Sequence, residues 1–301
     1  MLRGVRQPTP SERRGEQAMP MKPLDVTRFH QDEEFSKLLV GRRDVDLVVA
    51  ALELARDADP DLLFQPTLDW IQQRADQLTL QMAGSSSERD MLEQIVQCLS
   101  GEFGLKGDDG CFSRPESSFL PQVIESRRGL PITLSLLYCA VADRLGIALE
   151  LIPAPQHVVC QLRTDHATLY VDPFTEGRVL SEAECLAWLS VRTQIDPKDL
   201  LPTLKPASPR VVIERMLLNL KNLYMRQSNW AALWPVQYRL TALNPTSIEA
   251  CRDLGLIAAH AGRHGLAVTL LRECLPQVSE PDRATLLQQL AESARRLAQW
   301  N

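Results

Sequence analysis

A long apolar run, residues 132–145, limits the folds open to this chain more than any other segment. The run is hydrophobic nearly all the way round a helix, so such a helix has no polar face to turn toward solvent. Pro131 suits the first turn of the helix, and Gly146 suits its C-terminal cap. We therefore predict a buried central helix around which one domain packs.

Three short segments with strand character follow the apolar run, at residues 149–152, 158–163 and 168–171. Residues 119–126 before the run and residues 182–191 after the strands have helical spacing. These elements predict an α+β fold that is mostly helical, with a small antiparallel sheet packed on the central helix.

The first hundred residues predict further helices. Apolar residues recur at helical spacing between residues 25 and 98, with breaks at Pro60 and at Gly84. Ser87 suits the N-cap of the last of these helices, with Asp90 in its first turn. Residues 101–116 are rich in glycine and aspartate, which indicates a loop.

The C-terminal third has a different organisation. Four prolines fall within residues 196–209, which predicts a linker. Beyond it the sequence repeats at a period of about 35 residues, so that Leu220 matches Gly255 and Ala232 matches Ala267. Two helices per repeat of about this length are typical of tetratricopeptide repeats, and a generic array of helical hairpins is the alternative. The predicted domains are residues 24–195 and 210–301.

Composition excludes several classes of protein. The net charge of −5 gives no electrostatic reason to expect nucleic acid as a partner. No stretch approaches the roughly 20 apolar residues that span a bilayer. The seven cysteines form no CxxC pair, which is typical of a protein of the reducing cytoplasm. Residues 1–23 are polar and proline-rich without an apolar segment, so we expect a disordered tail rather than a secretion signal.

The sequence predicts no metal or cofactor. His260 and His264 have a spacing that could place two ligands on one helix face, but Gly262 and Gly265 break the helix there. A phosphate-binding loop and a dinucleotide fingerprint are both absent from the sequence.

A candidate site emerges from two residues of the strand region. His157 opens the second predicted strand and Asp172 closes the third. Side chains alternate along a strand and neighbouring strands lie about 5 Å apart, so a hydrogen bond between the two is expected. A carboxylate that orients a histidine is the second half of a thiol or serine site, which also needs a nucleophile.

Several motifs around this pair resemble the bacterial SirB-type family, which joins a transglutaminase-like core to tetratricopeptide-like repeats. They are Phe119-Leu-Pro-Gln-Val-Ile, Arg128-Gly-Leu-Pro-Ile-Thr-Leu-Ser, Asp172-Pro-Phe and Arg215-Met-Leu-Leu-Asn-Leu-Lys. The last motif links the second domain to the same family. The resemblance covers residues 40–300 and implies a papain- or transglutaminase-like core followed by helical repeats.

The resemblance also implies that the site lacks its usual nucleophile. Active transglutaminase-like enzymes have a Gly-x-Cys turn with Leu-Gly about 14 residues later. Here Gly129-Leu-Pro precedes Leu145-Gly at that spacing, so Pro131 stands at the cysteine position, and the SirB-type family is similar in lacking this cysteine. The family's usual glycine before the histidine is Gln156 here, so we expect the entry to that strand to differ locally.

Other side chains could replace the missing thiol. Ser135 lies one helical turn below Pro131 with Thr133 behind it, and Cys111 lies in a loop that could fold over the site. Gln122 could donate to an oxyanion, as a glutamine upstream of the cysteine does in papain-like sites. Each also has a structural interpretation, as a packing residue, a loop thiol or a surface amide.

Two hypotheses follow. In the first, the chain is a non-catalytic regulatory or scaffold protein of the cytoplasm, which binds a protein or peptide partner through its repeats or through the groove of its core. In the second, it is an acyl-transfer enzyme, an amidase, peptidase or transamidase, that uses a non-standard nucleophile with His157 and Asp172.

Overall fold

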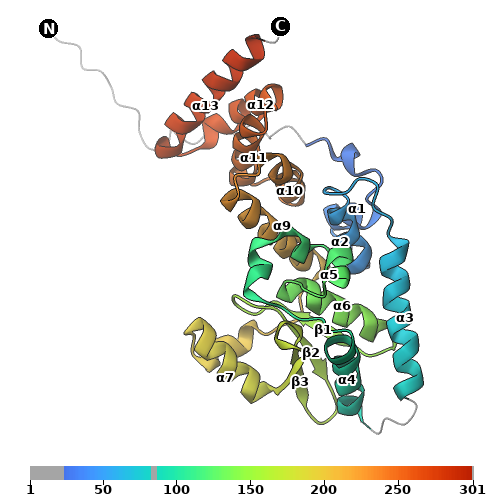
Figure 1. Ribbon diagram of the computed structural model, residues 1–301. Coiled ribbons are helices and arrows are strands. Elements are labelled where there is room, and N and C mark those ends of the chain that lie inside the picture. Colours follow the sequence, from blue (N-terminus) through green and yellow to red (C-terminus); the bar gives the residue numbers. More distant parts are fainter. Residues whose placement is uncertain (1–23, 83–86, 300–301) are drawn as a thin grey trace, which may run out of the picture. The chain divides into compact units, whose positions relative to one another are not determined.

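The computed structural model describes residues 24–82 and 87–299 of the chain. The predicted N-terminal tail, residues 1–23, lies outside the described residues. The chain divides into two compact units, residues 25–243 and the residues from Asn244 onward. Figure 1 labels the main helices and strands of both units.

Helices make up the first part of the larger unit, as the apolar spacing predicts. Their bounds are η1 (Val26–Phe29), α1 (Glu33–Leu39), α2 (Leu47–Ala55), α3 (Gln65–Gln81), α4 (Glu88–Val96) and the π-helix η3 (Gln97–Glu102). The Asp46 carboxylate caps α2 by accepting from two backbone N–H groups. The Ser87 hydroxyl accepts from the backbone N–H of Asp90, which confirms the predicted start of α4.

The central helix is α6 (Pro131–Arg144), and 10 of its 14 residues are buried. Two short helices, η4 (Asp109–Ser113) and η5 (Pro115–Ser118), lie in the predicted loop and lead into α5 (Leu120–Ser126). Helix α6 packs against α3 and against the first two strands of the sheet. The apolar run therefore forms the core element that its sequence predicts.

The sheet has four antiparallel strands in the order β1-β2-β3-β4. They are β1 (Leu149–Ile152), β2 (Val159–Arg163), β3 (Thr168–Asp172) and β4 (Arg178–Ser181), with η6 (Pro173–Thr175) before the last. The sulfur of Cys160 contacts α6 through the Ser135 carbonyl, while the adjacent Val159 packs in the apolar cluster beneath α7 (Glu182–Thr193). Because adjacent residues face opposite sides, α6 and α7 cover the two faces of the sheet.

The proline-rich segment between residues 196 and 209 lies against the sheet. It contains α8 (Pro197–Leu200) and η7 (Leu201–Thr203), and it buries Leu200 and Leu204 in the cluster beneath α7. The backbone N–H of Ala207 donates to the Leu151 carbonyl at 2.9 Å, on the edge of β1 that no other strand pairs. The segment thus protects one sheet edge.

Helices α9 (Pro209–Arg226) and α10 (Trp230–Leu243) belong to the larger unit. Arg239 of α10 is buried, and it donates to Asp57 at 2.6 Å and to Asp32 at 2.8 Å. Its guanidinium also lies over the rings of Phe29 and Phe35. This network joins α10 to the N-terminal helices. The domain boundaries proposed from the sequence stay a prediction.

The smaller unit contains α11 (Ile248–His260), α12 (His264–Cys274), η8 (Leu275–Gln277) and α13 (Glu280–Ala298). Gly255 of α11 lies against Leu271 of α12, where an added Cβ would come within 2.8 Å of the leucine side chain. Glycine at this position therefore allows the two helices to approach closely.

Candidate functional site

A tight turn delivers His157 to the sheet. The backbone N–H of His157 donates to the Ala154 carbonyl at 3.1 Å, and Pro155 and Gln156 form the turn between them. Gln156 has a φ of 58°, a left-handed conformation that glycine adopts most readily. The position at which the resemblance implies glycine therefore keeps a backbone typical of glycine, although glutamine occupies it here.

Arg215 of α9 fastens this turn. Its guanidinium donates to the carbonyls of His157 at 2.8 Å and Ala154 at 3.0 Å. Burial lowers the pKa of Arg215 below its ordinary value, but an arginine remains charged, so these are charge-assisted hydrogen bonds. The sequence contains a sign that Arg215 has a specific role, because this charged residue interrupts an apolar stretch of α9.

His157 and Asp172 meet as expected. The His157 Nε2 and Asp172 Oδ1 atoms lie 2.8 Å apart, and both side chains are buried. Asp172 also accepts from the Thr175 hydroxyl at 2.6 Å and from the Phe174 backbone N–H at 3.1 Å. An ionised carboxylate can only accept, so the proton lies on Nε2, and in the neutral ring Nδ1 is the basic nitrogen.

The environment keeps this carboxylate ionised. Burial acts to raise the pKa of Asp172, but the hydrogen bond from His157 acts to lower it. The bonds from Thr175 and Phe174 add to that effect, and the pKa of Asp172 lies below its ordinary value. The pair is therefore a charged, oriented unit of the kind that holds a general base.

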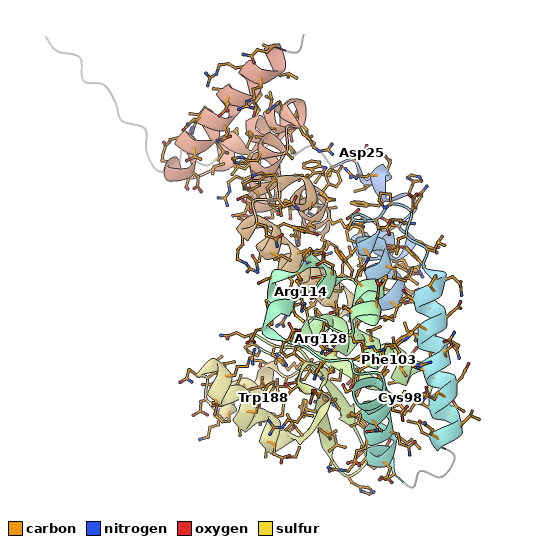
Figure 2. All side chains as sticks on the ribbon, in the orientation of Figure 1. Asp25, Cys98, Phe103, Arg114, Arg128 and Trp188 are labelled. Atoms are coloured by element: carbon orange, nitrogen blue, oxygen red, sulfur yellow. The ribbon has the colours of Figure 1, made fainter. Side chains whose placement is uncertain are left out.

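Aromatic rings enclose the imidazole. The Trp188 ring of α7 meets it edge-on at 5.0 Å between centroids, and the Phe174 ring does so at 5.8 Å. Figure 2 shows Trp188 on α7, which covers this face of the sheet. The Nδ1 atom is buried and has no hydrogen-bond partner among residues 24–82 and 87–299. Trp188 was not found by sequence reasoning, since one tryptophan in an amphipathic helix carries no signal of a site.

No thiol stands at the start of α6. Pro131 is the first residue of the helix, and the Thr133 hydroxyl donates to the carbonyls of Leu130 and Ser117 at its N-terminal end. The Ser135 hydroxyl is buried and, within the described residues, has no hydrogen-bond partner. Ser135 and His157 are therefore not hydrogen-bonded to each other. The side-chain oxygen of Gln122 is also buried and, within the described residues, has no hydrogen-bond partner, so it is not bonded to His157 either.

The nearby cysteines have the character of structural thiols. Cys111 is buried in η4, and Arg114 contacts its sulfur at 3.6 Å. Cys139 and Cys160 have their sulfurs 3.8 Å apart between α6 and β2. The contact with Cys160, together with burial, raises the pKa of the Cys139 thiol well above its ordinary value, so its nucleophilic thiolate form is rare.

Across the described part of the chain, no group of three histidine, cysteine or acidic side chains is arranged to hold a metal ion. In that same part, no helix has the length and apolar character that crossing a membrane requires.

A buried central helix, a histidine just before the second strand and an aspartate at the end of the third define a transglutaminase-like core, followed here by paired helices. The family model described as "Transglutaminase-like superfamily" matches residues 65–218, and the model described as "Tetratricopeptide repeat" matches residues 220–292. The chain belongs to the transglutaminase-like superfamily, in the group of SirB1 and UPF0162 proteins.

Relatives from several bacteria share most of this length. A UPF0162 protein of Xylella fastidiosa (strain Temecula1) is 30% identical over 78% of this chain and 85% of its own. A UPF0162 protein of Vibrio cholerae is 24% identical over 79% of this chain and 86% of its own. Protein SirB1 of Salmonella typhimurium is 24% identical over 64% of this chain and 72% of its own.

Among solved structures, the crystal structure of menin aligns with a TM-score of 0.38 and 12% identity. The alignment covers 87% of this chain and 81% of menin.

Proposed function

We propose that this protein is a non-catalytic, cytoplasmic member of its superfamily, with a regulatory or scaffold role that depends on binding a protein partner. One observation carries the proposal: the His157–Asp172 pair is intact, but among the described residues no nucleophile is hydrogen-bonded to its basic nitrogen Nδ1. A histidine base performs no acyl transfer unless a nucleophile is present for it to deprotonate.

The surroundings of the pair support the same conclusion. The His157 side chain is fully buried between Phe174 and Trp188, so a substrate would have to displace an aromatic ring to reach it. Asp172 also bonds to the backbone of Phe174 and the side chain of Thr175, which fixes the turn after β3. In this role the pair is a polar clamp that holds two loops together.

Partner binding is the remaining part of the proposal. Helical repeats stack into surfaces that bind proteins, and the repeat model covers residues 220–292. The alternative function, acyl transfer with a non-standard nucleophile, has the oriented His157–Asp172 pair in its favour.

One pair of measurements tests the proposal. The purified protein and its His157→Ala variant are assayed for hydrolysis of an aryl ester and for transfer of a primary amine to casein, and both proteins are used to capture partners from a cell extract. We expect no turnover that depends on His157 and one specific partner retained by the wild-type chain. Turnover that disappears in His157→Ala would establish the enzyme instead.

A further inference from the structure

Two cysteine side chains face each other inside the larger unit, where the central helix packs on the sheet. The sulfur of Cys139, on α6, lies 3.8 Å from the sulfur of Cys160, on β2. Figure 1 shows α6 beside these strands, and α6 and β2 contact each other. Both thiols are free. A disulfide joins its sulfurs at about 2.05 Å, so these two must approach by about 2 Å, which side-chain rotation can supply.

The Cys139 side of the pair can be reached from a pocket. Cys139 is half-buried and lines a pocket of about 330 Å³, whereas Cys160 is fully buried. The walls of this pocket include Asp46 of α2 and Asp143 and Arg144 of α6. A water molecule takes up about 30 Å³, so the pocket has room for a small oxidant such as hydrogen peroxide. The pair therefore has one thiol that a solute can contact and a second thiol directly behind it.

The second thiol is held in place. The Cys139 thiol donates to the Cys160 sulfur, and the Cys160 thiol donates to the Ser135 carbonyl at 3.6 Å. Cys160 lies in a strand that is paired on both sides, opposite Leu151 of β1 and Val171 of β3. The backbone of β2 is therefore fixed by its neighbours, and the sulfur of Cys160 stays beside that of Cys139.

We propose that Cys139 and Cys160 form a reversible disulfide when the protein meets a peroxide, and that this bond links the central helix to the sheet. The Cys139 thiolate attacks one peroxide oxygen and the O–O bond breaks. Cys139 becomes a sulfenic acid, and the other oxygen leaves as water with the Cys139 proton. The Cys160 sulfur then attacks the sulfenic sulfur, the S–O bond breaks, and a second water leaves with the Cys160 proton. The two thiols lose two electrons, and the peroxide gains them.

The surroundings of Cys139 make the first step slow. The hydrogen bond to Cys160 and burial raise the pKa of the Cys139 thiol, and the charges of Glu150 and Asp143 act in the same direction. The reactive thiolate is therefore scarce at neutral pH, and the link needs sustained exposure to peroxide. A thiol pair of this kind stays reduced in a reducing compartment and responds to oxidative stress.

Peptide mapping tests the link directly. Trypsin cuts after lysine and arginine, which places Cys139 alone in peptide 129–144 and Cys160 alone in peptide 145–163. The full-length protein is treated with hydrogen peroxide, alkylated and digested without reductant. We expect the main cross-link to join these two peptides, two hydrogen atoms lighter than their sum, and to separate on addition of dithiothreitol. The same treatment in concentrated urea should give mixed cross-links, because the unfolded chain does not select one pair.

Two variants and a melting experiment support the mapping. Cys139→Ser should form no such link, whereas the control Cys98→Ala, which removes another buried thiol, should keep it. Oxidised wild-type protein should melt about 5–10 °C higher than reduced protein, because the link closes a loop of roughly 20 residues in the unfolded chain. This shift should be absent in Cys139→Ser. The mapping of the wild-type chain holds even where the Cys139→Ser variant fails to fold.

Two results overturn the proposal. Peptides that stay separate after peroxide treatment, whether unmodified or with Cys139 carried on to its sulfinic or sulfonic acid, would show that the two sulfurs do not join. A main cross-link between other cysteines, such as Cys251 and Cys274 of the smaller unit, would place the reactive pair elsewhere. Either result leaves the proposed scaffold function standing, because partner capture and turnover are measured separately.

Discussion

At Gln156 a single side chain occupies a backbone conformation that suits glycine better. Its φ of 58° places it in the left-handed region, and its exposed side chain has no packing role to offset the strain. The strained residue lies directly before His157, in the turn that Arg215 fastens. The Arg215 guanidinium therefore holds the turn in a backbone conformation that Gln156 disfavours. Two single residues from distant segments, Gln156 and Arg215, thus set the position of His157.

Gln156→Gly should stabilise the protein. The substitution removes the left-handed strain, and the extra chain freedom of glycine in the unfolded state offsets part of the gain. We expect the free energy of unfolding to rise by about 0.5–1 kcal/mol, measured by urea denaturation. The matched change Gln73→Gly, within helix α3, should lower it by about 1 kcal/mol. A loss of stability in Gln156→Gly would show that the side chain has a role in the turn.

The ionised carboxylate of Asp172 should stabilise the folded protein, and this contribution should be lost at low pH. Its folded pKa is lowered, so the contribution is present above about pH 4, the ordinary range of an aspartate, and is lost as the pH falls through the folded pKa. Asp172→Asn should therefore unfold more easily than the wild type by about 2–3 kcal/mol at pH 7. The difference should shrink below pH 4, as followed by thermal denaturation across pH. A constant difference at all pH values would contradict an ionised Asp172.

Among the elements, α1 and α2 are joined by a buried carboxylate. Glu53 of α2 is 1% exposed, and it accepts from the backbone N–H groups of Glu34 at 3.0 Å and Phe35 at 2.7 Å. Both donors lie in the first turn of α1, so Glu53 satisfies N–H groups that have no partner inside that helix. Arg239 donates to the Glu53 carbonyl from α10, which brings a third helix to the same point.

This arrangement predicts a pH dependence of opposite sign to that of Asp172. Burial raises the pKa of Glu53 to about 6, although its backbone donors act to lower it. The folded state therefore binds the proton more tightly than the unfolded chain. The stability gained is full below about pH 4.5 and is lost as the pH rises through 6, by about 2 kcal/mol. Glu53→Gln should flatten this slope in urea titrations between pH 4.5 and 7, whereas the exposed-site control Glu125→Gln should keep it.

Elements were predictable where periodicity was strong and where a cap was present. The helix after Ser87, the apolar helix α6 and the first three strands all follow from local pattern. Strand β4 was not predicted, because Arg178-Val-Leu-Ser is short and only pairing with β3 makes it a strand. The packing of Leu200 and Leu204 on the sheet also depends on tertiary contacts, which proline content does not reveal.

At the scale of the whole molecule, the order of segments was enough to find the His157–Asp172 pair, because adjacent antiparallel strands must bring their ends together. The enclosure of that pair was not predictable. It depends on Trp188, from a helix that follows the sheet, and on Arg215 from α9. Arg215 lies more than 30 residues along the chain from both His157 and Asp172. Such contacts are set by the fold and leave no local pattern.

The division into compact units predicts which fragments fold. Residues 24–243 should unfold cooperatively, with the near-UV spectrum of packed aromatic side chains, because the fragment keeps Arg215 and Arg239. Residues 24–209 end at the predicted linker and lose both arginines, which leaves Asp32 and Asp57 without the buried cation they share. We expect this fragment to be less stable by at least about 3 kcal/mol, or unfolded. Equal stability of the two would place the boundary at the linker.

The ion pairs of Arg239 have a consequence for how such proteins diversify. A gene fusion at the proline-rich segment would separate Arg239 from its partners Asp32, which is buried, and Asp57, which is half-buried, and each product would inherit an unmatched charge. An exchange after Leu243 leaves the set intact. Natural recombination between relatives should therefore tolerate replacement of the last three long helices while α9 and α10 are inherited together with the core.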